Sequence, residues 1–360
     1  MRNVKRFPVL ISFLVILFLA ACSEDSNNEE MGKVDNSEGL DSSVTLKILD
    51  AGGTSGDTVQ YAYVDPFTEK TGIKVIRENP STFGKLQSMV KAGDTSYNLV
   101  ELSSSNLELA NSMGLLEELD WDLINPDPIL EEAKKPYGLG YQIFSTVMAW
   151  NPEATDGKDL ESWTDFWDVE KFPGRRSMPD YPNWVLPAAL LADGVPPEEL
   201  FPLDLDRAFA SLDKIKDHVD IWWESGAQPW QALIDGEVDY VIMWPSHAIN
   251  NMDMGMKFTY NQALLDMTNF AVPKGATKNS KETMALLHEF TKVENAGKAL
   301  EKVPSPGTTL NLEPLIPEKY KGYIATTDGN LQKHVPNDGK WWAENSEEVT
   351  KRWQQFKLSR

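Results

Sequence analysis

Residues 44–57, with the sequence VTLKILDAGGTSGD, hold the pattern that decides the fold. Val44–Asp50 is rich in apolar and β-branched residues, which predicts a strand, and the glycine-rich Ala51–Asp57 that follows predicts a turn. Thr58–Lys70 has apolar residues at helical spacing. The segment stops at Thr71-Gly72, where glycine suits the position just past a helix end. A strand that passes through a glycine turn into a helix indicates the beginning of an α/β fold.

The alternation of strand and helix continues to residue 105. Ile73–Ile76 predicts a second strand, Phe83–Ala92 a second helix and Tyr97–Leu102 a third strand. Such an order implies a parallel sheet covered by helices. Because ligands of these sheets bind outside the carboxyl ends of the strands, Gly52–Ser55 and Ser103–Ser105 are predicted to face a ligand.

A second set of elements begins near residue 144. The patterns predict strands at Phe144–Asn151, Val238–Trp244 and Phe270–Ala276, a short helix at Leu160–Trp167, and helices at Ser280–Val293 and Glu347–Phe356. About 315 residues follow the N-terminal region, more than one hydrophobic core usually holds, so we expect two lobes.

The first 21 residues have the composition of a secretory signal peptide. Arg2, Lys5 and Arg6 form a basic head, an apolar run follows, and small residues close the segment. A transmembrane helix needs about 20 apolar residues, and this run is shorter and is followed by polar residues. We therefore expect residues 1–21 to be removed on export.

Cys22 is the sole cysteine of the 360 residues. Its position directly after Leu-Ala-Ala resembles the lipobox of bacterial lipoproteins, in which the cysteine is lipidated and the preceding bond is cut. This resemblance implies that acyl chains such as palmitate on Cys22 anchor the protein outside the cytoplasm, on the outer face of the cytoplasmic membrane or in the periplasm. Residues 22–44 are rich in Ser, Asn, Glu and Asp and predict a flexible tether.

The chain is strongly acidic, with a formal net charge of −21. Removal of the three basic residues of the signal peptide leaves 31 basic and 55 acidic side chains, a net charge of −24. Such a field repels nucleic acid and anionic lipid surfaces, so we expect neither as a partner. Its simplest role is to keep an exposed protein soluble, and attraction of cationic solutes is a second interpretation.

The residue patterns of the common catalytic and metal sites are absent from the sequence. The four histidines are far apart and Cys22 has no cysteine partner, so zinc-ligand spacing is missing. Gly52–Gly56 reads Gly-Gly-Thr-Ser-Gly, which is neither the Gly-x-Ser-x-Gly of a hydrolase nor a phosphate loop. We therefore expect no cofactor, no metal and no enzymatic activity. A lipid-anchored hydrolase stays open as an alternative, because 55 acidic residues allow many carboxylate pairs.

Four segments in order resemble the extracellular solute-binding proteins of ABC importers, in the branch that includes the spermidine/putrescine-binding proteins. They are Pro66–Val75, Tyr97–Val100, Ser162–Arg175 and Gly236–Trp244, and the likeness spans roughly residues 45–310. It implies a two-lobed, periplasmic-binding-protein-like α/β fold of type II, each lobe a mixed sheet flanked by helices, with a ligand cleft between the lobes.

The resemblance also implies how the chain is divided and what it contacts. Lobe 1 would comprise residues 45–144 and 266–306, and lobe 2 residues 145–265 and 307–360. The expected partners are a small-molecule solute and the permease and ATPase subunits of an ABC importer, and the protein itself is expected to be a monomer.

The resemblance implies a set of ligand-binding residues, taken position by position. They are Gly53, Thr54, Ser55, Ser103, Ser104, Asp180, Asn183, Trp223, Ser225, Trp244, Ser246, Asp266 and Thr268. Trp244 matches an aromatic position of the polyamine binders, whereas Asn183 and Thr268 depart from their acidic pattern. Asp180 and Asp266 are the carboxylates that would compensate. Carboxylates pair with ammonium groups and aromatic faces flank methylene chains, so the expected solute is polyamine-like or bears another amine. An organic anion or ferric iron is the alternative in the same class of transporter.

Overall fold

The computed structural model describes residues 39–305, 307–327 and 329–360, which belong to one compact unit. The predicted signal peptide, Cys22 and most of the predicted tether lie outside these residues. Within them, no helix has both the length and the apolar character needed to cross a membrane. The described residues also contain no group of three or more His, Cys, Asp or Glu placed to hold a metal ion.

The N-terminal strands form the parallel sheet that the sequence predicts. β1 (Thr45–Leu49) lies between β2 (Lys74–Glu78) and β3 (Leu99–Ser103) and pairs in parallel with both. Leu46, Ile48 and Leu49 are fully buried because helices cover this part of the sheet. The predicted strand–helix alternation is confirmed.

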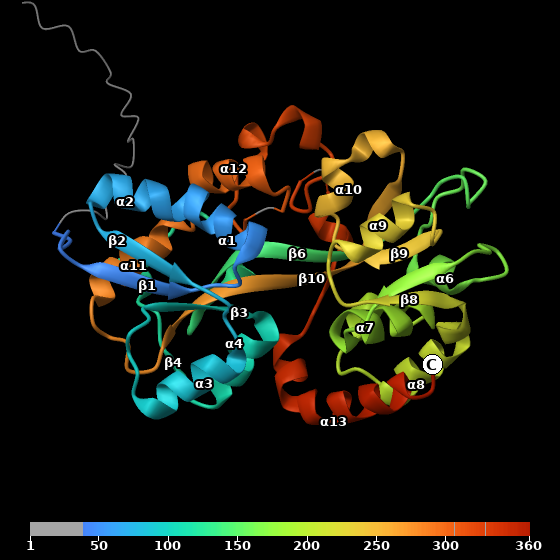
Figure 1. Cartoon of the computed structure of the whole chain (residues 1–360), viewed down its shortest axis with the longest axis horizontal. Coiled ribbons are helices and arrows are strands. Elements are labelled where there is room, and N and C mark those ends of the chain that lie inside the picture. Colours follow the sequence, from blue (N-terminus) through green and yellow to red (C-terminus); the bar gives the residue numbers. More distant parts are fainter. Residues whose placement is uncertain (1–38, 306, 328) are drawn as a thin grey trace, which may run out of the picture. The chain divides into compact units, whose positions relative to one another are not determined.

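The sheet continues through two long strands into a second half (Figure 1). β10 (Lys257–Pro273) pairs antiparallel with β3 and with β6 (Gly138–Trp150), and β6 pairs antiparallel with β9 (Tyr240–Met243). β7 (Arg176–Pro179) and β8 (Val219–Trp223) complete the path, in the order β2-β1-β3-β10-β6-β9-β7-β8. Three two-residue strands lie off this path: β4 (Leu116–Glu117), β5 (Lys134–Lys135) and β11 (Val335–Pro336).

Helices flank both halves of the sheet. They are α1 (Gly53–Val59), α2 (Asp65–Thr71), α3 (Phe83–Ala92), α4 (Ser104–Ser112), α5 (Trp121–Ile124), α6 (Trp163–Trp167), α7 (Pro182–Ala192), α8 (Leu205–Ile215), α9 (Gln228–Ile234), α10 (Ser246–Asn250), α11 (Ser280–Glu289), α12 (Val293–Lys302) and α13 (Gly339–Lys357). A π-helical turn, Gln60–Val64, joins α1 to α2.

The first helix begins five residues earlier than the sequence pattern indicates, at Gly53. The buried Asp50 explains the sharp turn that precedes it. Its carboxylate accepts a hydrogen bond of 2.8 Å from the backbone of Gly52 and pairs with Arg77 at 2.5 Å. Gly52 has a φ of 76°, a left-handed conformation that favours glycine. The glycine-rich turn is therefore shorter than predicted and leads directly into α1.

The C-terminal helix α13 packs against α7, one of the helices that cover the second half of the sheet (Figure 1). Trp353 and Phe356 join the same hydrophobic core as Trp163 and Leu186, which lie on α6 and α7. At its start, α13 also contacts α4, where Gly339 lies so close that an added Cβ would be 2.9 Å from the backbone of Ser104. The last helix thus touches elements of both halves.

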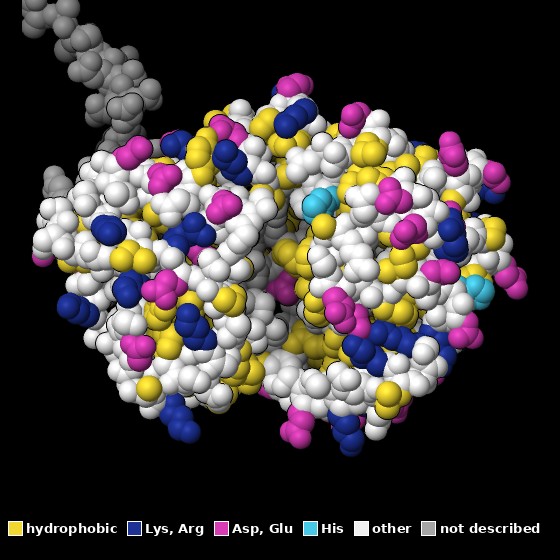
Figure 2. Space-filling model, viewed as in Figure 1, with side chains coloured by type: hydrophobic (Ala, Val, Ile, Leu, Met, Phe, Trp, Pro, Cys, Tyr) yellow, Lys and Arg dark blue, Asp and Glu magenta, His cyan; other side chains and the backbone are white. Residues whose placement is uncertain are grey.

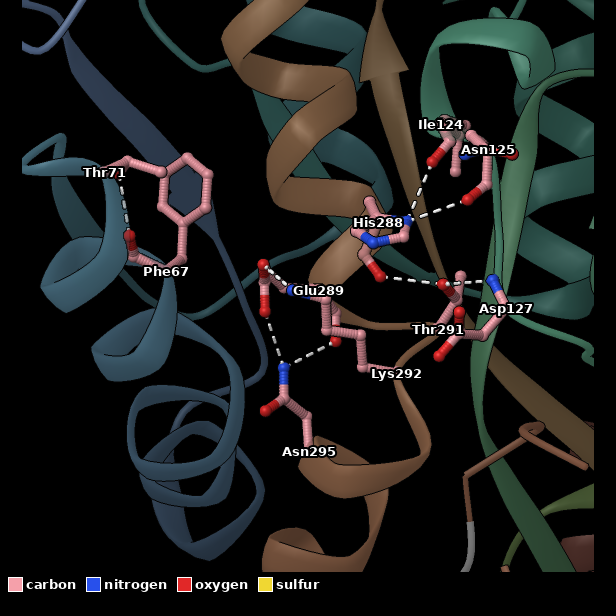
Figure 3. Close-up of polar contacts among 10 residues, drawn as sticks. All are labelled: Phe67, Thr71, Ile124, Asn125, Asp127, His288, Glu289, Thr291, Lys292 and Asn295. Atoms are coloured by element: carbon pink, nitrogen blue, oxygen red, sulfur yellow. Dashed lines mark hydrogen bonds and ion pairs between the residues drawn. The ribbon is translucent and has the colours of Figure 1, made fainter. Parts of the chain in front are cut away.

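The close-up in Figure 3 shows how α11 holds the loop after α5. Nδ1 of His288 lies 3.0 Å from the carbonyl oxygen of Ile124 and 2.9 Å from that of Asn125. Thr291 accepts a hydrogen bond of 3.1 Å from the backbone N–H of Asp127. These contacts account for His288 as a structural residue.

Candidate ligand-binding cleft

A hollow separates the two halves of the molecule in Figure 2, with acidic and hydrophobic side chains on its floor. A cavity of about 350 Å³ lies here, a volume within the usual range for small-molecule sites. Its lining comes from the β1–α1 turn, β3, β6, the β9–α10 junction, β10 and the segment after α12. The lining residues are Ala51, Thr54, Ser55, Glu101, Gln142, Ile143, Phe144, Ser145, Trp244, Pro245, Ser246, His247, Asn250, Tyr260, Thr268, Lys302, Val303, Pro304, Ser305 and Ala325.

A buried carboxylate, Glu101, lines this cavity from β3. It accepts hydrogen bonds from the backbone of Ala51 at 2.7 Å and from the Tyr141 hydroxyl at 3.0 Å. Burial raises the pKa of the Glu101 carboxyl, and these two hydrogen bonds oppose the rise. Since a carboxylate has about four acceptor positions, Glu101 retains capacity for a donor on a ligand.

Two serine hydroxyls of the lining donate their hydrogen bonds to groups of the protein. Ser305 donates to the carbonyl oxygen of Ile143 at 2.7 Å. Ser145 lies 2.9 Å from Nε2 of His334, whose Nδ1 lies 2.9 Å from the carbonyl oxygen of Asn330. Because a carbonyl only accepts, Nδ1 of the neutral ring carries the hydrogen and Nε2 accepts from Ser145. Both hydroxyl oxygens can therefore accept a hydrogen bond from a ligand, and neither has a proton left to donate to it.

An aromatic cluster forms the wall on the side of β9. Trp244 packs against Phe144 at 4.8 Å, Trp184 at 5.1 Å and Trp223 at 5.2 Å between ring centroids. The indole N–H groups of Trp184 and Trp244 are buried and have no hydrogen-bond partner among the described residues. Gly226 lies against Trp244, and an added Cβ would be 2.3 Å from its ring. The position of Trp244 therefore depends on a residue without a side chain at 226.

The remaining polar lining includes one cation. Lys302, at the end of α12, lines the cavity and lies over the Tyr61 ring at 4.5 Å. His247 lines it from α10, and burial lowers the pKa of this imidazole, which favours the neutral form. The lining of the cavity thus includes an acidic residue on β3 and a lysine at the end of α12.

The structure separates the predicted site residues into three groups. Thr54, Ser55, Trp244, Ser246 and Thr268 line the cavity described above. Ser104 and Asp266 line a second cavity of about 330 Å³, together with Lys135, His334 and other residues. Gly53, Ser103, Asp180, Asn183, Trp223 and Ser225 line neither cavity.

Asp266 and Thr268 lie inside the long strand β10, far from its ends. Asp266 pairs with Phe144 and Thr268 with Gln142, so these four side chains share one face of the sheet. Burial raises the pKa of the Asp266 carboxyl, and the backbone N–H of Met267 donates to it at 2.7 Å.

Asp180, a predicted ligand residue outside the two cavities, contacts the C-terminal segment. Its carboxylate is 2.6 Å from Lys357 and 2.7 Å from Arg360, and it accepts a hydrogen bond of 3.0 Å from the Trp353 indole. All three partners lie on α13 or just beyond it. The charge of Asp180 is therefore already paired within the protein, and the residue holds the C-terminal segment in place.

The other predicted residues outside the two cavities also make internal contacts. Trp223 is fully buried and donates to the carbonyl of Ile242 at 2.9 Å, so it supports Trp244 from beneath. Ser103 accepts a hydrogen bond from the backbone of Asn106 and caps α4. The remaining three are Gly53 at the start of α1, Asn183 in the first turn of α7 and the exposed Ser225 between β8 and α9.

Sequence analysis did not identify several lining residues, among them Glu101, Gln142, Ser145, Lys302 and Ser305. Glu101 did carry a detectable feature, since it is an acidic residue between the apolar Val100 and Leu102 of a buried strand. The role of Ser305 follows from its contact with β6, and nothing in the local sequence indicates that contact.

Comparison with known proteins identifies relatives along most of the chain. A sequence model of the family described as bacterial extracellular solute-binding protein matches residues 62–325. The gamma-aminobutyric acid-binding protein of Pseudomonas aeruginosa is 29% identical over 319 residues, 86% of this chain and 90% of that protein. The spermidine/putrescine-binding periplasmic protein of Escherichia coli is 23% identical over 269 residues, 70% of this chain and 75% of that protein.

Solved structures share the whole architecture. An ABC transporter substrate-binding protein from Bradyrhizobium japonicum superposes with a TM-score of 0.79 at 31% identity, covering 87% of this chain and 99% of that one. The Atu4243 GABA receptor gives a TM-score of 0.78 at 29% identity, covering 87% of this chain and 97% of that one.

A two-lobed α/β fold with a polar cleft between its lobes defines a solute-binding protein of the periplasmic-binding-protein type. The relatives are likewise solute-binding transport proteins and not enzymes. The chain belongs to the bacterial extracellular solute-binding protein family, and it is a substrate-binding protein of an ABC importer. The predicted family and fold class are confirmed.

Proposed function

We propose that this protein captures a small amine-bearing solute, specifically a zwitterionic amino acid of the γ-aminobutyrate kind, and delivers it to an ABC permease. The observation that carries the proposal is the presence of Glu101 and Lys302 in the lining of one cavity. A carboxylate pairs with the ammonium end of such a solute and a lysine with its carboxylate end. The Pseudomonas aeruginosa relative named for gamma-aminobutyric acid supports the same ligand class.

A polyamine is the second candidate, favoured by one observation. Asp266 supplies a second carboxylate in the neighbouring cavity, on the same sheet face as the lining residues Phe144 and Gln142. A diamine needs an acid at each end, whereas a zwitterion needs one acid and one donor group. The relatives named for spermidine and putrescine keep this candidate open.

Calorimetric titration of the purified protein with γ-aminobutyrate, putrescine, spermidine and butyrate separates the candidates. Ligand at 100 times its Kd stabilises the folded state by about 2.7 kcal/mol, so thermal unfolding gives a parallel readout. Tight binding of γ-aminobutyrate with weaker binding of putrescine supports the zwitterion. The reverse order supports the polyamine, and saturable binding of butyrate alone contradicts both. Recovery of the bound solute unchanged tests the absence of catalysis, which a lipid-anchored hydrolase would fail.

We also propose that Cys22 is lipidated and anchors the protein outside the cytoplasm. Cys22 follows Leu-Ala-Ala at the end of an apolar segment, and it precedes residues with the composition of a tether. Labelling of cells with an alkyne analogue of palmitate should mark the wild-type protein and leave Cys22→Ala unlabelled and released from the membrane fraction. Equal labelling of both proteins contradicts the anchor.

The proposed lobe boundaries, with residues 307–360 in lobe 2, have support in the packing of α13. Its aromatic residues share a core with α6 and α7, which lie within 145–265. Hydrogen exchange in the presence of ligand tests the boundaries. Protection that rises on both faces of the cleft, with α13 exchanging as one unit with α7, is the expected result.

A further inference from the structure

We propose that Ser145 and Ser305 form the subsite that receives the ammonium group of the solute, and that His334 is the positioning residue that keeps Ser145 a hydrogen-bond acceptor. The inference rests on the proposed function, because it assigns one end of the proposed ligand to particular atoms. Neither serine nor His334 belongs to the residues that the family resemblance implies.

The two hydroxyls are acceptors because of what they already donate to. The Ser305 proton is used by the Ile143 carbonyl at 2.7 Å, and the Ser145 proton by Nε2 of His334 at 2.9 Å. Both serines line the cavity, so their free lone pairs are available to a ligand donor. An ammonium group offers donors and no acceptor, whereas a carboxylate offers acceptors and no donor. This part of the cavity therefore selects for an amine.

Ser145 lies on β6, and Ser305 contacts the same strand from the segment after α12. Ser305 is bonded to the backbone of Ile143, two residues before Ser145, and strand residues two apart are separated by roughly 7 Å. Both serines line the same cavity, so a ligand group can lie between them. An ammonium group placed between them can donate to both oxygens and retain a third N–H for a further acceptor.

The direction of the Ser145 hydrogen bond depends on a fixed carbonyl behind His334. The side chain of Asn330 donates to the carbonyls of Gly322 at 3.2 Å and Ile324 at 3.1 Å, which holds this buried residue in place. Its own carbonyl then lies 2.9 Å from Nδ1 of His334. The hydrogen of the neutral ring is thereby kept on Nδ1, and Nε2 is left to accept from Ser145.

Protonation of His334 would reverse this arrangement. The imidazolium donates from both nitrogens, so Ser145 would accept from Nε2 and its own proton would turn toward the cavity and oppose an ammonium group. Burial lowers the pKa of His334, as does Lys333, while the carbonyls of Asn330 and Leu331 raise it. The net lowering keeps the ring neutral near pH 7.

Other titratable groups surround the ring and enter the pH dependence. Tyr260 of β10 lies 5.1 Å from it between ring centroids, and Glu132, Lys135 and Asp266 line the same cavity as His334. Glu101 lines the same cavity as Ser145, and its carboxyl has a raised pKa and would also lose its charge as the pH falls. The test must therefore separate the contribution of His334 from those of the two carboxyl groups.

Titration calorimetry with γ-aminobutyrate and butyrate provides that test, on wild type, Ser145→Ala and Ser305→Ala. Each serine variant should bind γ-aminobutyrate about 10- to 100-fold more weakly, the effect of losing a hydrogen bond to a charged group, with butyrate unchanged. Ser112→Ala is the matched control, since Ser112 is an exposed serine that also donates to a backbone carbonyl, at 2.8 Å. It should bind as wild type does.

The role of His334 is tested by the same titrations between pH 5 and pH 8. Neither ionisable group of γ-aminobutyrate titrates strongly in this range. Wild type should lose affinity as the pH falls, and His334→Phe and Ser145→Ala should show a smaller loss, the part that remains being due to the carboxyl groups. His218→Phe, a change at an exposed histidine, should keep the wild-type profile. If His334→Phe fails to fold, Ser145→Ala still carries the test.

The outcomes separate the inference from the proposed function. No binding of any amine by wild type contradicts the proposed function itself. Amine binding that Ser145→Ala and Ser305→Ala leave unchanged overturns the subsite alone. A weakened Ser145→Ala whose pH profile matches wild type overturns the positioning role of His334.

Discussion

Substitution of Asp180 by Asn should destabilise the protein and leave amine binding unchanged. The family resemblance implied that this carboxylate belongs to the ligand site, whereas the structure pairs it with Lys357 at 2.6 Å and Arg360 at 2.7 Å. In the wild type, the Trp353 indole donates to Oδ1 of Asp180 at 3.0 Å. Asn retains an oxygen that can accept this hydrogen bond, so the substitution removes mainly the negative charge. The two interpretations of Asp180 therefore predict opposite results in two measurements.

The expected cost follows from how deeply each partner is buried. Breaking a buried ion pair costs about 3–5 kcal/mol. The Asp180 side chain is 5% exposed, but Arg360 is 12% and Lys357 31% exposed, so both cations regain water when the carboxylate is lost. We expect a loss of about 2–3 kcal/mol in the free energy of unfolding at pH 7.

The pH dependence of this loss has a definite sign. Burial acts to raise the pKa of Asp180, and the hydrogen bonds from Lys357 and Arg360 outweigh it, so the pKa is lowered. The stabilisation is therefore complete above the unfolded-state pKa of about 3.9 and disappears as the pH falls through the lower, folded-state pKa. The gap between wild type and Asp180→Asn should narrow below about pH 4.

Urea denaturation of both proteins at pH 7, with γ-aminobutyrate titrations alongside, measures the two quantities. Asp206→Asn is the matched control, because Asp206 pairs with Arg352 of α13 at 2.8 Å but is 91% exposed. Such a pair contributes about 0–1 kcal/mol. If Asp180→Asn is as stable as the control and loses amine affinity, Asp180 belongs to the ligand site and the structural argument is wrong.

Three further substitutions test other parts of the cleft and its support. Glu101→Gln should raise the melting temperature at pH 7, because a buried carboxyl with a raised folded-state pKa destabilises the folded protein once it is charged. The same change should weaken amine binding at least about tenfold, since it removes the charge that pairs with the ammonium group. A lower melting temperature with unchanged amine binding contradicts both expectations. Gly226→Ala should displace Trp244, because the new Cβ would lie 2.3 Å from its ring. Calorimetry should then show about tenfold weaker ligand binding, and unchanged affinity would mean that Trp244 does not contact the ligand. Gly339→Ala would place a Cβ 2.9 Å from the Ser104 backbone, so it should lower the free energy of unfolding by about 1–3 kcal/mol in urea denaturation. An unchanged free energy of unfolding would mean that the start of α13 shifts to make room for the methyl group.

The sequence predicts the N-terminal part of the fold well because its strands are buried and short. β1 and β3 have apolar runs that end at turn residues, and α3 spans the predicted residues, Phe83–Ala92. β10 is different, since only its end, from residue 270, was predicted. Its register with β6 shifts between Thr259 and Leu264, where Gln262 has a φ of 57°. An irregular strand of this kind breaks the period of two on which pattern analysis depends.

The lining residues that follow the end of a strand were predictable from the sequence, whereas those inside a strand were not. Thr54, Ser55 and Ser246 follow strand ends, and the rule for parallel sheets places them at the cleft. Ser145 and Glu101 lie inside strands, where local pattern analysis looks for core residues. Their exposure to a cavity depends on which segment covers them, a long-range property of packing that the local sequence does not encode.

The acidity of the chain and the polarity of the cleft act at different distances. The formal net charge of −21 attracts any cation at low salt, but this field is screened within about 8 Å at physiological ionic strength. It attracts a dicationic polyamine, whereas a zwitterion, which has no net charge, is neither attracted nor repelled. The proposed preference for a zwitterion would therefore arise inside the cleft, from the contrast between the proposed acceptors Glu101, Ser145 and Ser305 and the cation Lys302. Under this proposal, the residues that favour a zwitterion over a polyamine are few, and the surface charge of the chain does not supply that preference.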